Sequence, residues 1–458
     1  MINIIFTFLS FVLLIAIIVG IHELGHFLAA RKFNVHVIRF KIGFGRTLAT
    51  WFDKKGTEFS LGLLPLGGYV QMLGEENPLQ PDEQIQKNNF NTISYPQASL
   101  GARAIITVAG PLANFVLAVF AYLLIFMIGV KDLAPVVGAV EKDSLADKAG
   151  LEVGDKILSL DDQEVLSLKD LNKLLGLRIG ETGTIEIDYQ KSKSNLRYSK
   201  SVDINNWLHS ELDQSLISSF GIKPFLPALI GLVEANSPAN NSGLQEGDQI
   251  LSVGGIQTRT WYELVNEISS NPDKDTTLSI LRDGETLSLL ISIGARKNDL
   301  GIKVGRIGIS MISTNNEMPD EFLVETKKGL IEAFVLGVKE TYSFTVLIFD
   351  SIGKMVTGSV SSENIGGPIQ IAILSGSAAK AGIISFINMI ALLSINLGLI
   401  NLLPIPVLDG GQLVLISAEK IKGSALSERF LEFVYKIGLL FVVGLIFFAF
   451  YNDIARMV

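Results

Sequence analysis

Residues 1–26 read MINIIFTFLSFVLLIAIIVGIHELGH, and this stretch decides how the rest of the chain is interpreted. Its first 21 residues carry no charge, and about 20 such residues are enough for a helix to cross a bilayer. A cleaved signal peptide is the alternative, but no basic residue precedes the run and a histidine motif lies where a cleavage site should be. We therefore predict a membrane-spanning helix that ends in His22, Glu23 and His26.

The composition fits a membrane protein that has no nucleic-acid partner. Of the 458 residues, 48% are hydrophobic and 18% are charged, against about 25% charged in a soluble domain. The formal net charge is −8, whereas nucleic-acid-binding domains are usually basic. The absence of cysteine excludes a disulfide scaffold, a cysteine nucleophile and thiolate metal ligands. Any catalytic or metal-binding imidazole must come from four histidines: His22, His26, His36 and His209.

Three further uncharged runs predict three more spans. They are Ala104–Val130, Ala381–Leu408 and Ile437–Asn452. The third run is interrupted near its end by Pro404 and Pro406, and non-helical backbone at membrane depth is tolerated only where it is buried or lines a cavity. The sequence therefore predicts four transmembrane helices, with a break at the end of the third.

The distribution of basic residues predicts the orientation. Seven lysines and arginines follow the first span between positions 31 and 55, and none precedes it. Others lie between the third and fourth spans. Because short cytoplasmic loops are enriched in Lys and Arg, we expect residues 31–103 and 410–433 to be cytoplasmic. Both termini and residues 131–380 should then face the outside.

The middle of the chain is an internal repeat. A shift of 93 positions aligns Gly138–Ser159 with Gly231–Ser252, with 12 of 22 residues identical. Each copy predicts a short helix with a glycine C-cap (Gly150, Gly243), a Gly-Asp turn and an apolar strand. Further on, Arg282–Glu285 lies between two alternating runs and predicts a hairpin.

The repeat resembles two tandem PDZ domains of the bacterial protease type, on the shared pattern GL..GD.IL. This resemblance implies PDZ domains at 131–222 and 223–316 that bind peptide or protein ends by strand addition. Rigid spacers that only restrict access are the alternative. Residues 317–358 then carry apolar side chains three or four apart, which predicts an amphipathic helix on the outer membrane surface. Packing against a PDZ domain is the alternative for that helix.

The HELGH motif has the spacing of a metal site. Positions i and i+4 lie on one face of a helix, so His22 and His26 can bind one metal while Glu23 acts as general base. Ionisable residues at the end of an apolar span are costly and are therefore functional candidates. An interfacial motif that merely flanks the helix is the alternative.

A catalytic zinc site usually has three protein ligands, and the best third candidate is Asp409. It follows the third span, which runs in the same direction as the first, so its carboxylate should lie at the depth of the HELGH motif. A helix cap or a turn before Gly410 is the alternative. His36 and His209 are poorly placed for this role.

These motifs together resemble the site-2 protease family of intramembrane zinc metalloproteases. The likeness rests on HELGH, on NLLPIPVLDGG at Asn401–Gly411 and on the repeat between them. It implies one Zn²⁺ held by His22, His26 and Asp409, with Glu23 as the catalytic base. The fold class expected is a polytopic α-helical membrane protein with four transmembrane helices, a membrane-associated β-hairpin and two inserted tandem PDZ (α+β) domains. Residues 1–130 and 359–458 would form the membrane part.

The resemblance also implies substrate-binding residues. Gly43, Phe44 and Gly45 would belong to a re-entrant β-hairpin whose edge pairs with the unwound substrate, because peptidases bind substrates as strands. An ordinary cytoplasmic hairpin is the alternative. Asn396 and Asn401 would position substrate beside the zinc, or would form hydrogen bonds between helices.

By the same resemblance, the substrates are single-span membrane proteins already trimmed on the outer side, such as anti-sigma-E factors, and remnant signal peptides. The location implied is a bacterial inner membrane, with periplasmic PDZ domains and termini and an active site near the cytoplasmic side. Nothing in the sequence indicates an oligomer, so a monomer is expected. Two other classes are a non-catalytic membrane PDZ scaffold or quality-control holdase, and a metal transporter. A transporter would need metal-binding residues along a path, but here they lie at one depth.

Overall fold

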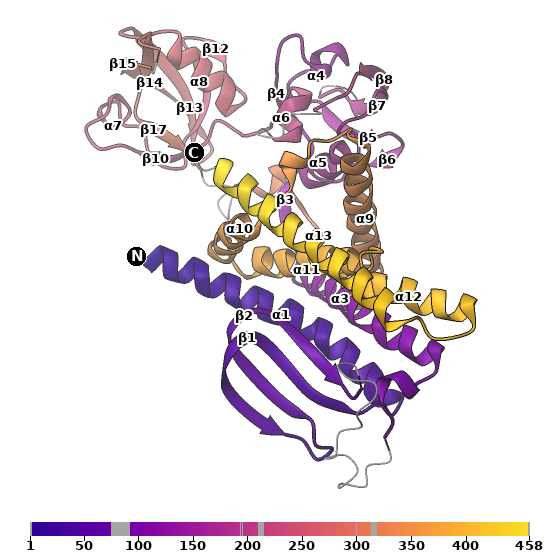
Figure 1. Ribbon diagram of the computed structural model, residues 1–458. Helices are drawn as coiled ribbons and strands as arrows, with labels where there is room; N and C mark the ends of the chain where they lie inside the picture. Colours follow the sequence, from indigo (N-terminus) through magenta and orange to yellow (C-terminus); the bar gives the residue numbers. More distant parts are fainter. Residues whose placement is uncertain are drawn as a thin grey trace. The chain divides into compact units, whose positions relative to one another are not determined.

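The four apolar runs form long helices in the computed structural model. Within the residues that it describes (2–74, 92–192, 194, 196–208, 215–298, 300–312 and 318–456), four helices are long and apolar enough to cross a membrane. They are α1 (Ile2–Lys32), α3 (Leu100–Ile128), α11 (Ile383–Asn401) and α13 (Glu428–Ala455) (Figure 1). The prediction of four membrane-spanning helices is confirmed at this level.

The chain divides into two units, each described here by itself. One contains Met1–Val130 together with Lys327–Val458, and the other contains Lys131–Thr326. The repeat lies within the second unit. The boundaries predicted between the two copies and after the second copy stay predictions.

In the first unit, α3 is the central helix. It packs against α1 on one side, where a Cβ on Gly25 would lie 2.2 Å from the carbonyl oxygen of Ala109. It also packs against α11 through a buried apolar cluster (Ala118, Ala121, Tyr122, Ile125, Ala391 and Ile395). Gly25 brings the α1 and α3 backbones close together at Ala109, and this close approach fixes which side chains of the two helices can meet.

The predicted amphipathic helix is present as α9 (Leu330–Thr357). Its Gly337 lies against the α3 backbone, and Phe344 stacks on Tyr122 with ring centroids 6.1 Å apart. Small residues (Ala333, Gly337 and Thr341) form the buried face, as close packing between helices requires. The helix therefore has a packing partner in α3, and its location at the membrane surface stays a prediction.

The third span ends earlier than the uncharged run does. Helix α11 stops at Asn401, residues 402–408 are non-helical, and α12 (Asp409–Lys422) begins at the aspartate. The prolines cause this, because Pro404 and Pro406 lack the N–H that a helix needs. The predicted break is thus confirmed. Helix α12 is tied to α3 by an ion pair of 2.6 Å between Arg103 and Glu419, and α10 (Pro368–Ala381) precedes α11.

Two long strands, β1 (Val37–Phe52) and β2 (Glu58–Met72), pair in antiparallel fashion. Each bends, so the first half of β1 pairs on both sides: Phe40 faces Phe59 and also Val70. Gly43 and Gly45 lie at the bend of β1 with φ of 89° and 80°, a conformation that glycine adopts at little cost. The second half of β2, up to Met72, is therefore an edge strand that pairs with β1 on one side only.

In the second unit, both copies of the repeat have the same topology, with sheets ordered β6-β5-β7-β8 and β12-β11-β13-β14. The first copy contains β4 (Val137–Val140), α4 (Leu145–Lys148), β5 (Lys156–Leu160), β6 (Gln163–Glu164), α5 (Leu168–Gly176), β7 (Gly183–Gln190), β8 (Arg197–Ile204), α6 (Leu216–Phe220) and β9 (Ile222–Pro224). The second contains β10 (Ile230–Val233), α7 (Pro238–Asn241), β11 (Gln249–Val253), β12 (Ile256–Gln257), α8 (Trp261–Ser269), β13 (Asp275–Arg282), β14 (Glu285–Ser292), β15 (Gly294–Lys297), β16 (Lys303–Arg306) and β17 (Ile309–Met311). The structural repeat therefore extends well beyond the aligned 22 residues.

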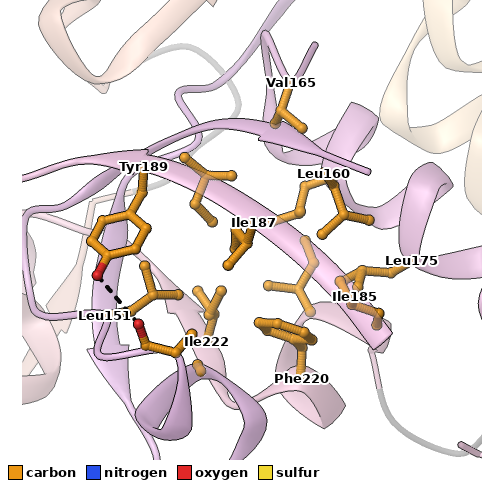
Figure 2. Close-up of a cluster of buried hydrophobic side chains, with 14 of the residues drawn as sticks. Leu151, Leu160, Val165, Leu175, Ile185, Ile187, Tyr189, Phe220 and Ile222 are labelled. Atoms are coloured by element: carbon orange, nitrogen blue, oxygen red, sulfur yellow. Dashed lines mark hydrogen bonds between the residues drawn. The ribbon is translucent and has the colours of Figure 1, made fainter. Parts of the chain in front are cut away.

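The predicted local signals of the repeat are confirmed. Gly150 and Gly243 follow their helices with φ of 72° and 84°, as a left-handed C-terminal residue requires. Asp283 and Gly284, both with positive φ, connect β13 to β14. The core of the first copy includes Phe220 and Tyr189 (Figure 2), and the Tyr189 hydroxyl donates to the carbonyl oxygen of Ala149 at 3.2 Å.

The second unit begins and ends in one small ribbon. Strand β3 (Lys131–Leu133) pairs with β18 (Leu323–Glu325) in antiparallel register, so Lys131 faces Glu325. The chain therefore enters and leaves the second unit through two neighbouring, hydrogen-bonded strands.

Candidate metal centre

His22 and His26 lie one turn apart on α1, and both are buried. Their Nε2 atoms are 3.2 Å apart. Asp409, the first residue of α12, brings one carboxylate oxygen to 3.3 Å from His22 Nε2 and the other to 3.5 Å from His26 Nε2. The structure thus brings together the three residues that the sequence nominated as metal ligands.

These distances fit a tetrahedral zinc site. Ligand atoms 2.0–2.2 Å from zinc at tetrahedral angles lie roughly 3.3–3.5 Å apart. The two Nε2 atoms are 3.2 Å apart, and each lies 3.3–3.5 Å from a different oxygen of Asp409, so each neighbouring pair has a spacing close to that of a zinc site. Among the described residues, His22, His26 and Asp409 form the one group of three or more candidate ligands found. Two imidazoles and one carboxylate are a donor set typical of catalytic zinc.

Each imidazole has a second polar neighbour on its far side. His26 Nδ1 lies 2.9 Å from the carbonyl oxygen of Ile106 on α3. A carbonyl only accepts, so Nδ1 carries the proton and Nε2 keeps the lone pair that a metal needs. His22 Nδ1 lies 3.3 Å from the amide of Asn114 on α3, and His22 Nε2 lies 3.3 Å from the amide of Asn401.

Gly110 makes room for the second histidine. A Cβ at this position would lie 2.2 Å from Nε2 of His26. The ring of His26 therefore rests on the α3 backbone, held between that backbone and Asp409. Gly110 and Asn114 both lie on α3, and their contacts with the histidines are visible only in the structure.

A pocket of about 230 Å³ opens beside these ligands. Its lining includes the glutamate of HELGH, Asn401, part of β2 and residues of α3 and α12: His22, Glu23, His26, Gly68, Tyr69, Val70, Met72, Tyr95, Ile106, Thr107, Asn401, Val407, Leu408, Asp409 and Gln412. Asn396, Gly43, Phe44 and Gly45 do not line it. Their predicted role in substrate binding stays a prediction, and the β2 residues that do line the pocket were not among the predicted substrate-binding residues.

Among the described residues, the remaining histidine, His36, is not part of this centre. His36 is buried but does not line the pocket. His209 lies outside the described residues. The poor placement expected of His36 agrees with this, and for His209 the expectation stays a prediction.

Comparison with known families decides the class of protein. The profile of peptidase family M50 matches residues 10–445. The chain belongs to peptidase family M50. As an M50 member it is an intramembrane zinc metallopeptidase, so the predicted site-2 protease class and the predicted enzyme activity are confirmed.

This M50 chain is similar along its full length to regulators of sigma-E protease. It is 38% identical over 452 residues to the regulator of sigma-E protease RseP of Escherichia coli K12, covering 98% of each chain. It is 35% identical over 451 residues to the regulator of sigma E protease of Haemophilus influenzae, again with 98% of each chain covered. A putative zinc metalloprotease of Vibrio cholerae is 33% identical over 461 residues, 100% of each chain. The predicted resemblance to the site-2 protease family is thus confirmed, and within that family the chain is similar to the regulators of sigma-E protease.

Among solved structures, a PDZ domain of an SdrC-like protein from Listeria monocytogenes matches a small part of the M50 chain. It covers 20% of this chain and 92% of that one, with 19% identity and a TM-score of 0.17. A TM-score this low carries no argument about the fold of the repeat.

Proposed function

We propose that this chain cleaves peptide bonds inside membrane-spanning segments of proteins whose outer part has already been removed. Substrates of this class are anti-sigma-E factors and remnant signal peptides, and their cleavage would transmit envelope stress. The names of the relatives, which regulate sigma E, support this choice. The single observation that carries the proposal is the cluster of His22, His26 and Asp409, whose neighbouring ligand atoms lie 3.2–3.5 Å apart beside a buried glutamate.

In this proposal His22, His26 and Asp409 hold one zinc ion per chain. Zinc bound there supplies Lewis-acid chemistry, activating a water molecule and polarising a substrate carbonyl. The protein's part is to fix the three ligand atoms. Ile106 orients one imidazole through its carbonyl oxygen, and the start of α12 presents the carboxylate of Asp409.

Glu23 is the proposed general base. It is 9% exposed, follows His22 directly and lines the pocket beside the ligands. Its carboxylate would take a proton from the attacking water and then deliver that proton to the leaving amine. The amide of Asn401 lies 3.3 Å from His22 Nε2 and would donate a hydrogen bond to the substrate carbonyl at this position.

The edge of β2 is the proposed substrate track. Residues 68–72 pair with β1 on one side only, and Gly68, Tyr69 and Val70 line the pocket. An unwound substrate could add to the side of this strand that does not pair with β1, by backbone hydrogen bonds beside the contact between the Val70 backbone and Glu23. Gly43 and Gly45 would contribute by forming the bend that creates this edge. Phe44 packs over Gly67, next to the pocket, since a Cβ on Gly67 would lie 2.2 Å from its ring.

The repeat would act as the selectivity element, as two tandem PDZ domains on the periplasmic side of the inner membrane. In the second copy, α8 and the segment before β17 line a groove of about 150 Å³. The groove is apolar along Leu264 and Ile268 and has Arg306 in its lining. A peptide or protein end is the occupant that such a groove suits. The active site would lie near the cytoplasmic side, with both termini periplasmic, in a monomeric chain.

A cleavage assay tests the proposed function. An epitope-tagged single-span substrate, truncated on its outer side, is co-expressed with the wild-type chain, with Glu23→Gln and with the control Glu432→Gln. Glu432 is an exposed glutamate on α13. We expect cleavage within the span by wild type and control, none by Glu23→Gln, and equal zinc in all three. Equal cleavage with and without Glu23 would refute its role as base. A scaffold or holdase would be unaffected by Glu23→Gln.

A further inference from the structure

Asn114 is the polar residue whose surroundings are least explained by packing. It lies on α3 with none of its surface exposed, and its Nδ2 atom is 3.3 Å from Nδ1 of His22. Its Oδ1 atom is buried and has no partner in the part of the chain that the structure describes. A buried amide oxygen without a hydrogen-bond partner lowers the stability of the fold, so a function is expected for an asparagine at this position.

Helix α3 provides a polar neighbour for the Nδ1 atom of both histidines. Ile106 offers its carbonyl oxygen to His26 Nδ1 at 2.9 Å, and Asn114 offers its amide to His22 Nδ1. In a helix the carbonyl groups point toward the C-terminus, whereas side chains lean toward the N-terminus. The two groups, eight residues apart on α3, therefore converge on two histidines that are four residues apart on α1.

The orientation of the amide decides which nitrogen of His22 faces a metal. With Nδ2 toward His22 Nδ1, the ring must carry its proton on Nε2, the atom that faces Asp409 at 3.3 Å. Metal binding requires the reverse, with the proton on Nδ1 and the lone pair on Nε2. The two ends of an amide have nearly the same shape, so a rotation by about 180° presents Oδ1 as the acceptor that Nδ1–H then needs.

We propose that Asn114 is a positioning residue, which accepts a hydrogen bond from His22 Nδ1–H and holds the ring with Nε2 toward the metal. This rests on the proposed zinc centre. It makes Asn114 the side-chain counterpart of the Ile106 carbonyl. It also gives the buried Oδ1 atom a partner in the zinc-bound protein, while Nδ2 takes the position that Oδ1 now occupies.

The competing explanation is that Asn114 only fills space between helices. Gly398 of α11 lies close by, since a Cβ added there would be 3.5 Å from Cβ of Asn114. If filling space were the whole role, an apolar side chain of equal size would serve at least as well, and a buried carboxylate would serve worse. A positioning role demands an acceptor oxygen, so it ranks Asp above Leu. The two explanations therefore predict opposite orders.

The affinity of the variants for zinc distinguishes the positioning role from the space-filling role. The dissociation constant of Zn²⁺ is determined by chelator competition on the full-length protein in detergent, for wild type, Asn114→Leu and Asn114→Asp. We expect Asn114→Leu to bind zinc about 10–100-fold more weakly, the usual cost of losing an outer hydrogen-bond partner, and Asn114→Asp to stay within about threefold of wild type. Asn388→Leu is the matched control, because Asn388 also has a buried amide oxygen without a described partner but does not line the pocket.

The opposite order, with Leu equal to wild type and Asp weaker, would overturn the proposal. A second readout needs no variant: in zinc-loaded wild type labelled with ¹⁵N-histidine, the nitrogen of His22 that carries the proton must be Nδ1. A metal-bound Nδ1 would overturn the proposal even if Asn114→Leu fails to fold. If wild type takes up no zinc, or Asp409→Ala keeps it, the zinc centre itself fails. If wild type binds zinc through Asp409 and Asn114→Leu binds equally well, only the inference about Asn114 fails.

Discussion

A methyl group on Gly110 would lie 2.2 Å from Nε2, 2.6 Å from Cε1 and 2.8 Å from Cδ2 of His26. Ordinary contacts of this kind are about 3.5–4.0 Å, so in Gly110→Ala the imidazole must move by at least about 1.3 Å. The ring has nowhere to go without losing its contacts, because it is held by the Ile106 carbonyl and faces Asp409. Metal–ligand distances tolerate only about 0.2 Å, and a misplacement of about 1 Å in a catalytic group costs on the order of 100-fold in rate.

We therefore expect Gly110→Ala to lower both zinc affinity and cleavage of a trimmed single-span substrate by about 100-fold or more. The matched control is Gly101→Ala on the same helix, where an added Cβ meets nothing within 4 Å. That variant should keep both properties. Zinc content is measured per folded protein, with circular dichroism to verify helix content. The reasoning is refuted if Gly110→Ala folds, binds zinc and cleaves within about threefold of Gly101→Ala.

Three further predictions concern the ion pairs and the metal. Burial lowers the pKa of Lys191, but the carboxylates of Asp155 and Glu152 have the larger effect and hold that pKa above its ordinary value. Because Lys191→Met removes the cation from these carboxylates, the variant should destabilise the second unit at pH 7 by about 1–2 kcal/mol. Because the folded-state pKa is raised, this contribution is complete below the unfolded pKa of about 10.4 and is lost as the pH rises through the folded value. A wild-type–variant difference in unfolding that does not shrink as the pH rises above about 10.4 would contradict it. Arg103→Met should cost about 3 kcal/mol, since it leaves Glu419, 12% exposed, without its cation, and adding Glu419→Met should recover much of that loss in denaturant titrations. Removal of zinc by a chelator should abolish cleavage and lower the unfolding temperature, and added Zn²⁺ should restore both, because an ion bound to the folded state stabilises it. Full activity after complete zinc removal would contradict the assignment of the metal site.

Signals that are local or periodic could be predicted from the sequence. HELGH places two side chains on one helical face by spacing alone, and Pro404 and Pro406 end α11 whatever surrounds them. The repeat carries its own glycine and capping residues, so its helices and hairpin follow from short segments. The membrane part was predictable because about 20 uncharged residues have few other uses.

Features that depend on distant pairing could not be predicted. Which part of the β1–β2 hairpin becomes the edge strand depends on the bends in both strands and on the pairing of one segment of β1 with two segments of β2. The glycines around Gly43 indicate a bend, but they do not indicate which strand then lies at the edge. The carbonyl of Ile106 contacts His26 through backbone, so no residue type signals it. Asn396 and Asn401 differ in outcome for a simpler reason. Five residues turn a helix by about 140° beyond a full turn, so both side chains cannot face the pocket.

The two-stranded ribbon of Lys131–Leu133 and Leu323–Glu325 has a consequence for how this chain could have been assembled. The cost of closing a loop grows only by about 0.6 kcal/mol for each doubling of its length, and a folded insert whose ends already pair closes like a tight turn whatever its size. The link between α3 and α9 therefore has the properties of a short connection, although the whole of Lys131–Thr326 lies within it. Inserts of one, two or more repeats could be exchanged at this point, and a short hairpin grafted onto the same three residue pairs should leave the helices around the zinc ligands able to fold.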